Sequence, residues 1–253
     1  MVEPPAPPAS GGLPAYFRVT RGPWYGFVFA LPILLSYQAL VWVLQPHIIN
    51  GADAALWRAL GPLFATFGWQ SREAVLLVVL IVGGIGSWLA HRRRYPAPAD
   101  RRLHLAWFIP MLAESCFYAL FFGIAVNRIL VTLGLQIGRG GGPLTQVMLA
   151  LGAGIYEELL FRVLIMGGLA LLLMRATRFG PLVSWVCAAL FSSAIFSLFH
   201  YLGAAGDVFT VESFLFRFVS GALLAALYGL RGFGIAVWTH ALYDLLVMGL
   251  HGG

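Results

Sequence analysis

The residues of this chain best suited to chemistry are two adjacent carboxylates, Glu157 and Glu158, in a stretch that is otherwise apolar. An ionised side chain in the middle of a membrane helix costs roughly 2.5–3.5 kcal/mol even on a lenient scale. Residues four apart in an α-helix lie nearly on one face, whereas neighbours point about 100° apart. We therefore expect Glu158 to pair with Arg162, and Glu157 to project into a cavity, where an unpaired, desolvated carboxylate suits a general base. A purely structural Glu158–Arg162 pair would leave Glu157 unexplained.

Three further polar residues lie in later apolar stretches. His200 closes one of them, and His240 and Asp244 lie four residues apart in the last one, so that their side chains face the same way. Each has a simpler interpretation. His200 could be an interfacial histidine, and His240 and Asp244 could form a local hydrogen bond that ties two helices together. Lipid disfavours polar groups on the outer surface of a bundle, so polar residues from separate spans tend to converge inside it. Together with Glu157, these residues predict one internal site.

The amino-acid composition indicates that these apolar stretches are surrounded by lipid. The chain is 60% hydrophobic and only 10% charged, and its mean hydropathy is +0.85. A soluble domain carries about 25% charged residues. We therefore predict an all-α, polytopic transmembrane helix bundle. The net charge of +6 comes entirely from arginines flanking apolar runs, which indicates topology signals and contacts with an anionic lipid bilayer rather than a nucleic-acid partner.

A membrane span needs about 20 mostly apolar residues. We expect about seven spans, with six to eight admissible, over residues 24–44, 73–90, 105–135, 145–174, 181–201, 211–230 and 232–250. Residues 54–61 are short and of mixed polarity, which favours an interfacial helix. Residues 1–22 are rich in proline and glycine and are expected to form a mobile tail. Residues 23–104 would then form the N-terminal membrane segments with a basic loop, and residues 105–250 a catalytic core.

Arginine placement predicts the topology. The loop 91–104 carries five arginines and should be cytoplasmic by the positive-inside rule. Seven alternating spans then place ten arginines inside and three outside, with the N-terminus in the cytoplasm. We expect a bacterial inner membrane, and a site that opens toward the non-cytoplasmic side.

Three motifs carry a resemblance: Glu-Glu-x-x-x-Arg at 157–162, Phe-x-x-x-His at 196–200 and His-x-x-x-Asp at 240–244. In this order, on apolar spans, they resemble the CAAX protease and bacteriocin-processing family over about residues 105–250. The resemblance implies a glutamic-type intramembrane endopeptidase, without a cofactor, that cleaves a membrane-anchored or lipidated protein near its C-terminus or anchor.

The resemblance also implies roles for the residues. Glu157 and His200 would activate the attacking water, His240 and Asp244 would stabilise the oxyanion, and Glu158 and Arg162 would support them. The prenyl-protease branch usually has asparagine at the position of Asp244. Since an ionised aspartate would repel an oxyanion, Asp244 must either be protonated or orient His240 through a hydrogen bond.

Two other interpretations stay open. Glu157, His200, His240 and Asp244 are all acceptable zinc ligands, although the His-Glu-x-x-His signature of zinc proteases is absent. The chain could also be a non-enzymatic membrane protein, namely a transporter with a proton-relay glutamate, an immunity protein or a scaffold. A transporter has no need for His240 and Asp244 to face a bound carbonyl.

Overall fold

The computed structural model describes residues 13–46, 49–68, 71–133, 142–203 and 206–250, and the regular structure of these residues is entirely helical. The predicted all-α fold class is therefore confirmed. The elements are, in chain order, α1 (Leu13–Thr20), α2 (Pro23–Leu44), α3 (Gly51–Ala65), α4 (Arg72–Arg94), α5 (Pro98–Arg101), the 3₁₀ turn η1 (Leu105–Trp107), α6 (Phe108–Leu133), α7 (Pro143–Gly152), the π-helix η2 (Ala153–Met166), α8 (Gly167–Ala176), α9 (Pro181–Phe199), α10 (Val211–Arg231) and α11 (Phe233–Leu250).

The predicted spans correspond to these helices. Within the described residues, six stretches are long and apolar enough to cross a membrane: Pro23–Leu44, Leu76–Arg94, Leu105–Val126, Pro143–Ala176, Pro181–Phe199 and Val211–Arg231. The seventh predicted span corresponds to a shorter apolar helix, Phe233–Gly249. Residues 134–135, at the end of the third predicted span, lie outside the described residues. The chain is an integral membrane protein built as a helix bundle.

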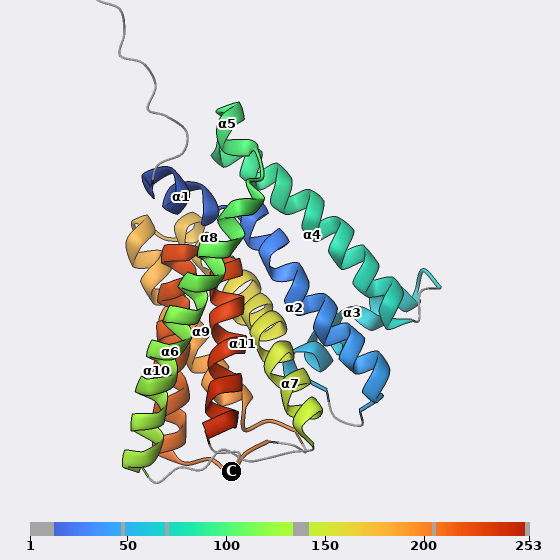
Figure 1. The fold of residues 1–253 in the computed structure, drawn as a ribbon, viewed down its shortest axis with the longest axis vertical. Helices are drawn as coiled ribbons and strands as arrows, with labels where there is room; N and C mark the ends of the chain where they lie inside the picture. Colours follow the sequence, from blue (N-terminus) through green and yellow to red (C-terminus); the bar gives the residue numbers. More distant parts are fainter. Residues whose placement is uncertain (1–12, 47–48, 69–70, 134–141, 204–205, 251–253) are drawn as a thin grey trace, which may run out of the picture.

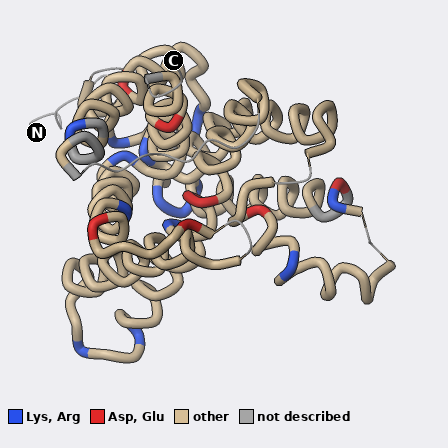
Figure 2. Tube along the Cα trace, turned by 90° about the horizontal axis from the view of Figure 1, so that it is seen from below, with Lys and Arg blue, Asp and Glu red and all other residues tan. Residues whose placement is uncertain are grey.

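Helix α11 lies at the centre of the bundle. It packs against α6, η2, α2, α10 and α7, and its residues Ile235, Val237 and Ala241 are fully buried. Figure 1 shows α6, α9, α10 and α11 running side by side, while α2 and α4 lean away from them. Outward-facing side chains such as Trp42 and Ile109 are about three-quarters exposed, at 76% and 75%, as expected for a surface that faces lipid. Figure 2 shows how few charged residues the bundle carries, with acidic and basic ones close together in its interior.

Helix α3 is the predicted interfacial element, and it is longer than expected. It spans Gly51–Ala65 instead of residues 54–61, and it is not among the candidate membrane spans. Asn50 caps its N-terminus, because the side-chain oxygen of Asn50 accepts from the backbone N–H groups of Ala52 and Asp53. Asp53 accepts a hydrogen bond from Tyr37 of α2 and pairs with Arg72 of α4 at 2.5 Å. These contacts fix α3 against both neighbouring spans.

Helix α1 corrects the expectation of a mobile tail through residue 22. Residues 1–12 lie outside the described residues, but Leu13–Thr20 is helical and buries Tyr16 and Val19. The Tyr16 hydroxyl donates to Glu114 of α6 at 2.9 Å, and Arg231 at the end of α10 pairs with the same carboxylate. Burial, and then the adjacent Glu114, raise the pKa of Tyr16, so its hydroxyl stays protonated and remains a donor. This cluster holds α1 on the bundle, which a proline-rich composition did not predict.

The π-helix η2 carries the paired glutamates and approaches α11 closely. The backbone N–H of Gly167 donates to the carbonyl of Arg162, five residues earlier, as in a π-helix. The α-helical geometry assumed from the sequence is therefore wrong for residues 153–166, which form a π-helix. A Cβ atom at Gly154 would lie 2.7 Å from both the Cβ of Ala241 and the carbonyl oxygen of Val237. Only glycine lets η2 lie this close to α11.

Candidate active site

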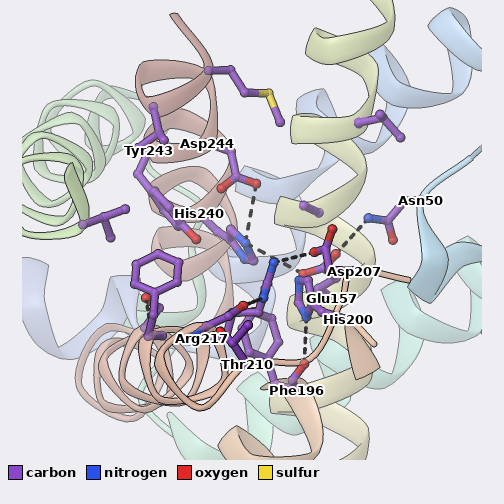
Figure 3. Close-up of a pocket in the computed structure, with 18 of the residues that line it drawn as sticks. Asn50, Glu157, Phe196, His200, Asp207, Thr210, Arg217, His240, Tyr243 and Asp244 are labelled. Carbon is purple, nitrogen blue, oxygen red and sulfur yellow. Dashed lines mark hydrogen bonds and ion pairs between the residues drawn. The ribbon is translucent and has the colours of Figure 1, made fainter. Parts of the chain in front are cut away.

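A cavity of about 460 Å³ brings the predicted site residues together. Glu157 comes from η2, His200 from the end of α9, and His240 and Asp244 from α11. Figure 3 shows these side chains converging from their separate helices on one space. Other lining residues are Asn50, Leu149, Phe196, Asp207, Arg217 and Tyr243. The convergence expected from three separate spans is present.

Glu157 lies at the cavity wall with its two oxygens in different surroundings. Its Oε1 accepts a hydrogen bond from the Nδ2 of Asn50 at 2.9 Å. Its Oε2 lies 3.9 Å from the Nε2 of His240, which is beyond hydrogen-bond distance. The side chain was expected to be unpaired, and the bond from Asn50 corrects that expectation. The bond leaves Oε2 facing the ring of His240.

Glu158 holds His240 in place. Its Oε1 lies 2.8 Å from the Nδ1 of His240, and its Oε2 lies 3.3 Å from the Nε of Arg162. The ion pair with Arg162 is the one that the spacing predicts, but the bond to His240 was not foreseen. Asp244 lies 3.7 Å from the Nε2 of His240, too far for a hydrogen bond. The ring is therefore oriented by Glu158 and not by Asp244.

Arg162 is buried behind Glu158 and contacts two neighbouring helices. The Arg162 side chain is 1% exposed, and its Nη2 donates to the backbone carbonyl of Gly221 in α10 at 3.3 Å. The centre of the guanidinium also lies 4.8 Å from the ring centroid of Phe196, within cation–π range. A buried cation is tolerated when it is paired and hydrogen-bonded. Arg162 therefore links η2, α9 and α10 behind the site.

His200 presents one ring nitrogen to the cavity. Its Nδ1 lies 2.9 Å from the carbonyl oxygen of Phe196. A carbonyl oxygen can only accept, so Nδ1 carries a proton and donates it there. Neutral His200 then has its lone pair on Nε2, where it can accept a proton or a hydrogen bond. The backbone N–H of Asp207 donates to the carbonyl of His200 at 2.9 Å, which holds Asp207 next to the end of α9.

Polar residues of the connection between α9 and α10, and of the first turns of α10, form a rim on the cavity. Arg217 pairs with Asp207 at 2.5 Å and donates to the hydroxyl of Tyr201 at 3.1 Å. The side chain of Thr210 caps α10 by accepting from the backbone N–H of Ser213. This rim has no counterpart among the three motifs.

One comparison with known proteins bears on this site. Residues 140–246 match the family model described as type II CAAX prenyl endopeptidase Rce1-like. The matched segment is similar to that family and covers less than half of the 253-residue chain. The resemblance seen in the three motifs is thereby confirmed, and it indicates an intramembrane protease of the CAAX type. No curated protein and no solved structure matches the chain.

The Rce1-like segment contains Glu157, Glu158, Arg162, His200, His240 and Asp244, but it does not contain all of the cavity. Asn50, which donates to Glu157, lies outside this segment and precedes it in the sequence, at the start of α3. Sequence reasoning missed Asn50, although its place before a helix with Asp at the third position is typical of a cap. The cap signal predicts a helix start but says nothing of a distant carboxylate.

Metal binding was the main chemical alternative for these residues. Among the described residues, no group of three or more histidine, cysteine, aspartate or glutamate side chains is arranged to hold a metal ion. Cys116 and Cys187, on α6 and α9, are both exposed on the outer surface of the bundle.

Proposed function

We propose that the chain is a glutamic-type intramembrane endopeptidase that hydrolyses a peptide bond near the C-terminus or membrane anchor of a substrate protein. The observation that carries the proposal is the convergence of Glu157, His200 and His240 on one cavity, within a segment of the Rce1-like family. The catalytic core would comprise residues 105–250. The substrate would be a membrane-anchored or lipidated protein, reached within the bilayer.

The first step is the attack of water on the scissile carbonyl. Glu157 takes one proton from the water as general base, and the Nε2 lone pair of His200 accepts a hydrogen bond from the other O–H and so orients the water. Proton transfer by a positioned side chain contributes about 10²–10⁴-fold in rate. A bond then forms between the water oxygen and the carbonyl carbon, which leaves a tetrahedral oxyanion.

His240 is placed to stabilise that oxyanion. Its Nδ1–H is engaged by Glu158, so donation from Nε2 requires a doubly protonated ring. Glu157, Glu158 and Asp244 surround the ring and would balance its positive charge. A protonated Asp244 would add a second donor, whereas an ionised one would act only on His240. The carbon–nitrogen bond then breaks, and the proton held by Glu157 passes to the leaving amine.

The test is cleavage of membrane-anchored candidate substrates by the purified protein in nanodiscs, with and without a zinc chelator. We expect chelator-resistant cleavage. His240→Ala should lower kcat by about 10²–10³-fold, the usual cost of an oxyanion donor, and His240→Gln, which keeps a side-chain N–H, should lower it less. Cleavage that a chelator abolishes and added zinc restores would favour a metalloprotease. No cleavage of any candidate would favour the non-enzymatic alternatives.

We also propose that the cavity opens to the non-cytoplasmic side of a bacterial inner membrane. The arginine-rich loop lies at the end of the bundle where α1 and α5 meet, and the loop between α9 and α10, which rims the cavity, lies at the opposite end (Figure 1). The positive-inside rule puts the arginine-rich end in the cytoplasm. Such a site suits the trimming of exported proteins close to their membrane anchor.

Cysteine labelling in intact cells tests this orientation. In a Cys116→Ala, Cys187→Ala background, we expect Leu202→Cys to react with a membrane-impermeant maleimide, because Leu202 is exposed in the loop after α9. Phe179→Cys, exposed between α8 and α9 at the other end, should react only after permeabilisation. The reverse pattern would place the site on the cytoplasmic side.

A further inference from the structure

Asn50 makes a contact that the proposed reaction, as described so far, does not use. It precedes α3, an interfacial helix outside the Rce1-like segment, and is 7% exposed. Its side chain forms hydrogen bonds both with the backbone at the start of α3 and with Glu157. The Oδ1 atom accepts from the backbone N–H groups of Ala52 at 2.9 Å and Asp53 at 3.4 Å, and the Nδ2 atom donates to Glu157 at 2.9 Å.

These contacts determine which way the amide of Asn50 faces. Turning it over would place its NH₂ group against two backbone donors and its oxygen against the carboxylate of Glu157. Both arrangements are repulsive, so the amide has a single favourable orientation. The cap of α3 therefore fixes the position of an N–H donor that points at Glu157 (Figure 3).

Close packing keeps this donor at its distance from η2. A Cβ atom at Gly152 would lie 2.8 Å from the Cβ of Asn50 and 2.6 Å from the Cε2 of Tyr37. A Cβ atom at Gly51 would lie 3.2 Å from the ring of Phe199, next to His200. The start of α3 is thus fitted against both helices that carry the proposed water-activating residues.

The geometry points to Asn50 as a positioning residue for the general base. By holding Oε1 of Glu157, it sets the rotation of the carboxylate so that Oε2 faces the cavity and His240. The inference rests on the proposed role of Glu157. It adds that the N-terminal segment is part of the catalytic apparatus and not only a membrane anchor for the Rce1-like segment.

The central test is Asn50→Ser. Serine caps helices as well as asparagine does, but its hydroxyl is too short to replace the amide donor at Glu157. We expect kcat to fall about 10–100-fold, the loss typical of a hydrogen bond to a charged group, with KM and the melting temperature of the protein nearly unchanged. Asn50→Asp, which also keeps a cap, should lower kcat further because two carboxylates would then face each other.

A matched control removes a similar bond beside the site. The Nε2 of Gln38 in α2 donates to the hydroxyl of Tyr156 at 2.5 Å, so Gln38→Met breaks an amide contact with the residue next to Glu157 without touching Glu157 itself. It should leave kcat within about twofold. Asn50→Ala, which removes both cap and donor, should lower kcat and thermal stability together.

The outcomes separate this inference from the proposed function. If Asn50→Ser and Asn50→Asp cleave at the native rate while Glu157→Gln does not cleave, Asn50 is only a helix cap and the positioning role is wrong. If Gln38→Met loses as much activity as Asn50→Ser, general loosening of η2 explains the effect and the inference also fails. If Glu157→Gln cleaves normally, both the inference and the proposed base are overturned.

Discussion

Glu157→Gln is expected to lower kcat/KM by roughly 10²–10⁴-fold, because glutamine cannot take a proton from the attacking water. The substitution is nearly isosteric, and the amide oxygen of glutamine can still accept the hydrogen bond from Asn50. The protein should therefore remain folded, with a melting temperature close to the native value. Cleavage rates of purified variants in nanodiscs, with thermal unfolding recorded in parallel, check both parts of this prediction.

The matched control for this variant is Glu73→Gln. Glu73 is an exposed carboxylate in the first turn of α4, and it is not among the residues that line the cavity. Its neutralisation should leave cleavage unchanged. Native-like turnover by Glu157→Gln would show that another group takes the proton. Unfolding of Glu157→Gln would instead mean that its loss of activity cannot be read as chemistry, and the rates of His200→Gln would then decide.

Glu158→Leu is expected to cause the largest loss of stability of any single substitution in the site. Glu158 is fully buried between Arg162 and His240, so its removal leaves Arg162, which is 1% exposed, without its anion. Breaking one partner of a buried ion pair costs about 3–5 kcal/mol. Thermal unfolding in detergent should show a marked fall in melting temperature, and cleavage should be lost because His240 is no longer oriented.

The double variant Glu158→Leu/Arg162→Met separates the two effects. Replacing both members of a buried ion pair by apolar residues is often neutral for stability or even stabilising. We therefore expect the melting temperature to recover toward the native value while cleavage stays low, since the Nδ1 of His240 still lacks its acceptor. Recovery of cleavage along with stability would contradict the assignment of Glu158 as the residue that orients His240.

The bundle and the convergence of the site could be predicted from the sequence because the cost of polar groups in lipid is large and one-sided. Glu157, His200, His240 and Asp244 each lie in an apolar stretch, and burial in one shared cavity is the arrangement that lipid least opposes. The partners of these residues are a different matter. Nothing in the spacing of Glu158 and His240, 82 residues apart, distinguishes that pair from the pair of His240 with Asp244.

The contact between Asn50 and Glu157 is the clearest case of a feature that could not be predicted from the sequence. This contact depends on how α3 turns back against η2, and that turn depends on Tyr37, Asp53 and Arg72 acting together. Each of these residues has an ordinary local explanation in the sequence. Tyr37 can be an aromatic residue of a span, Asp53 an acidic residue in the first turn of a helix, and Arg72 a positive charge in a loop. The tail was misjudged for a related reason, because Tyr16 in α1 finds its partner Glu114 about a hundred residues away.

The absence of a side chain at Gly154 sets how far apart η2 and α11 may lie in the candidate site. A methyl group there would have to move η2 and α11 apart by about 0.7 Å, from 2.7 Å to the 3.4 Å of ordinary contact. A displacement of that size along the bond between Glu158 and His240, now 2.8 Å, would stretch it to about 3.5 Å, where hydrogen bonding fails. A residue that contributes no side-chain atom to the site therefore determines whether Glu158 and His240 can meet, and the forced displacement that would separate them is only about 0.7 Å.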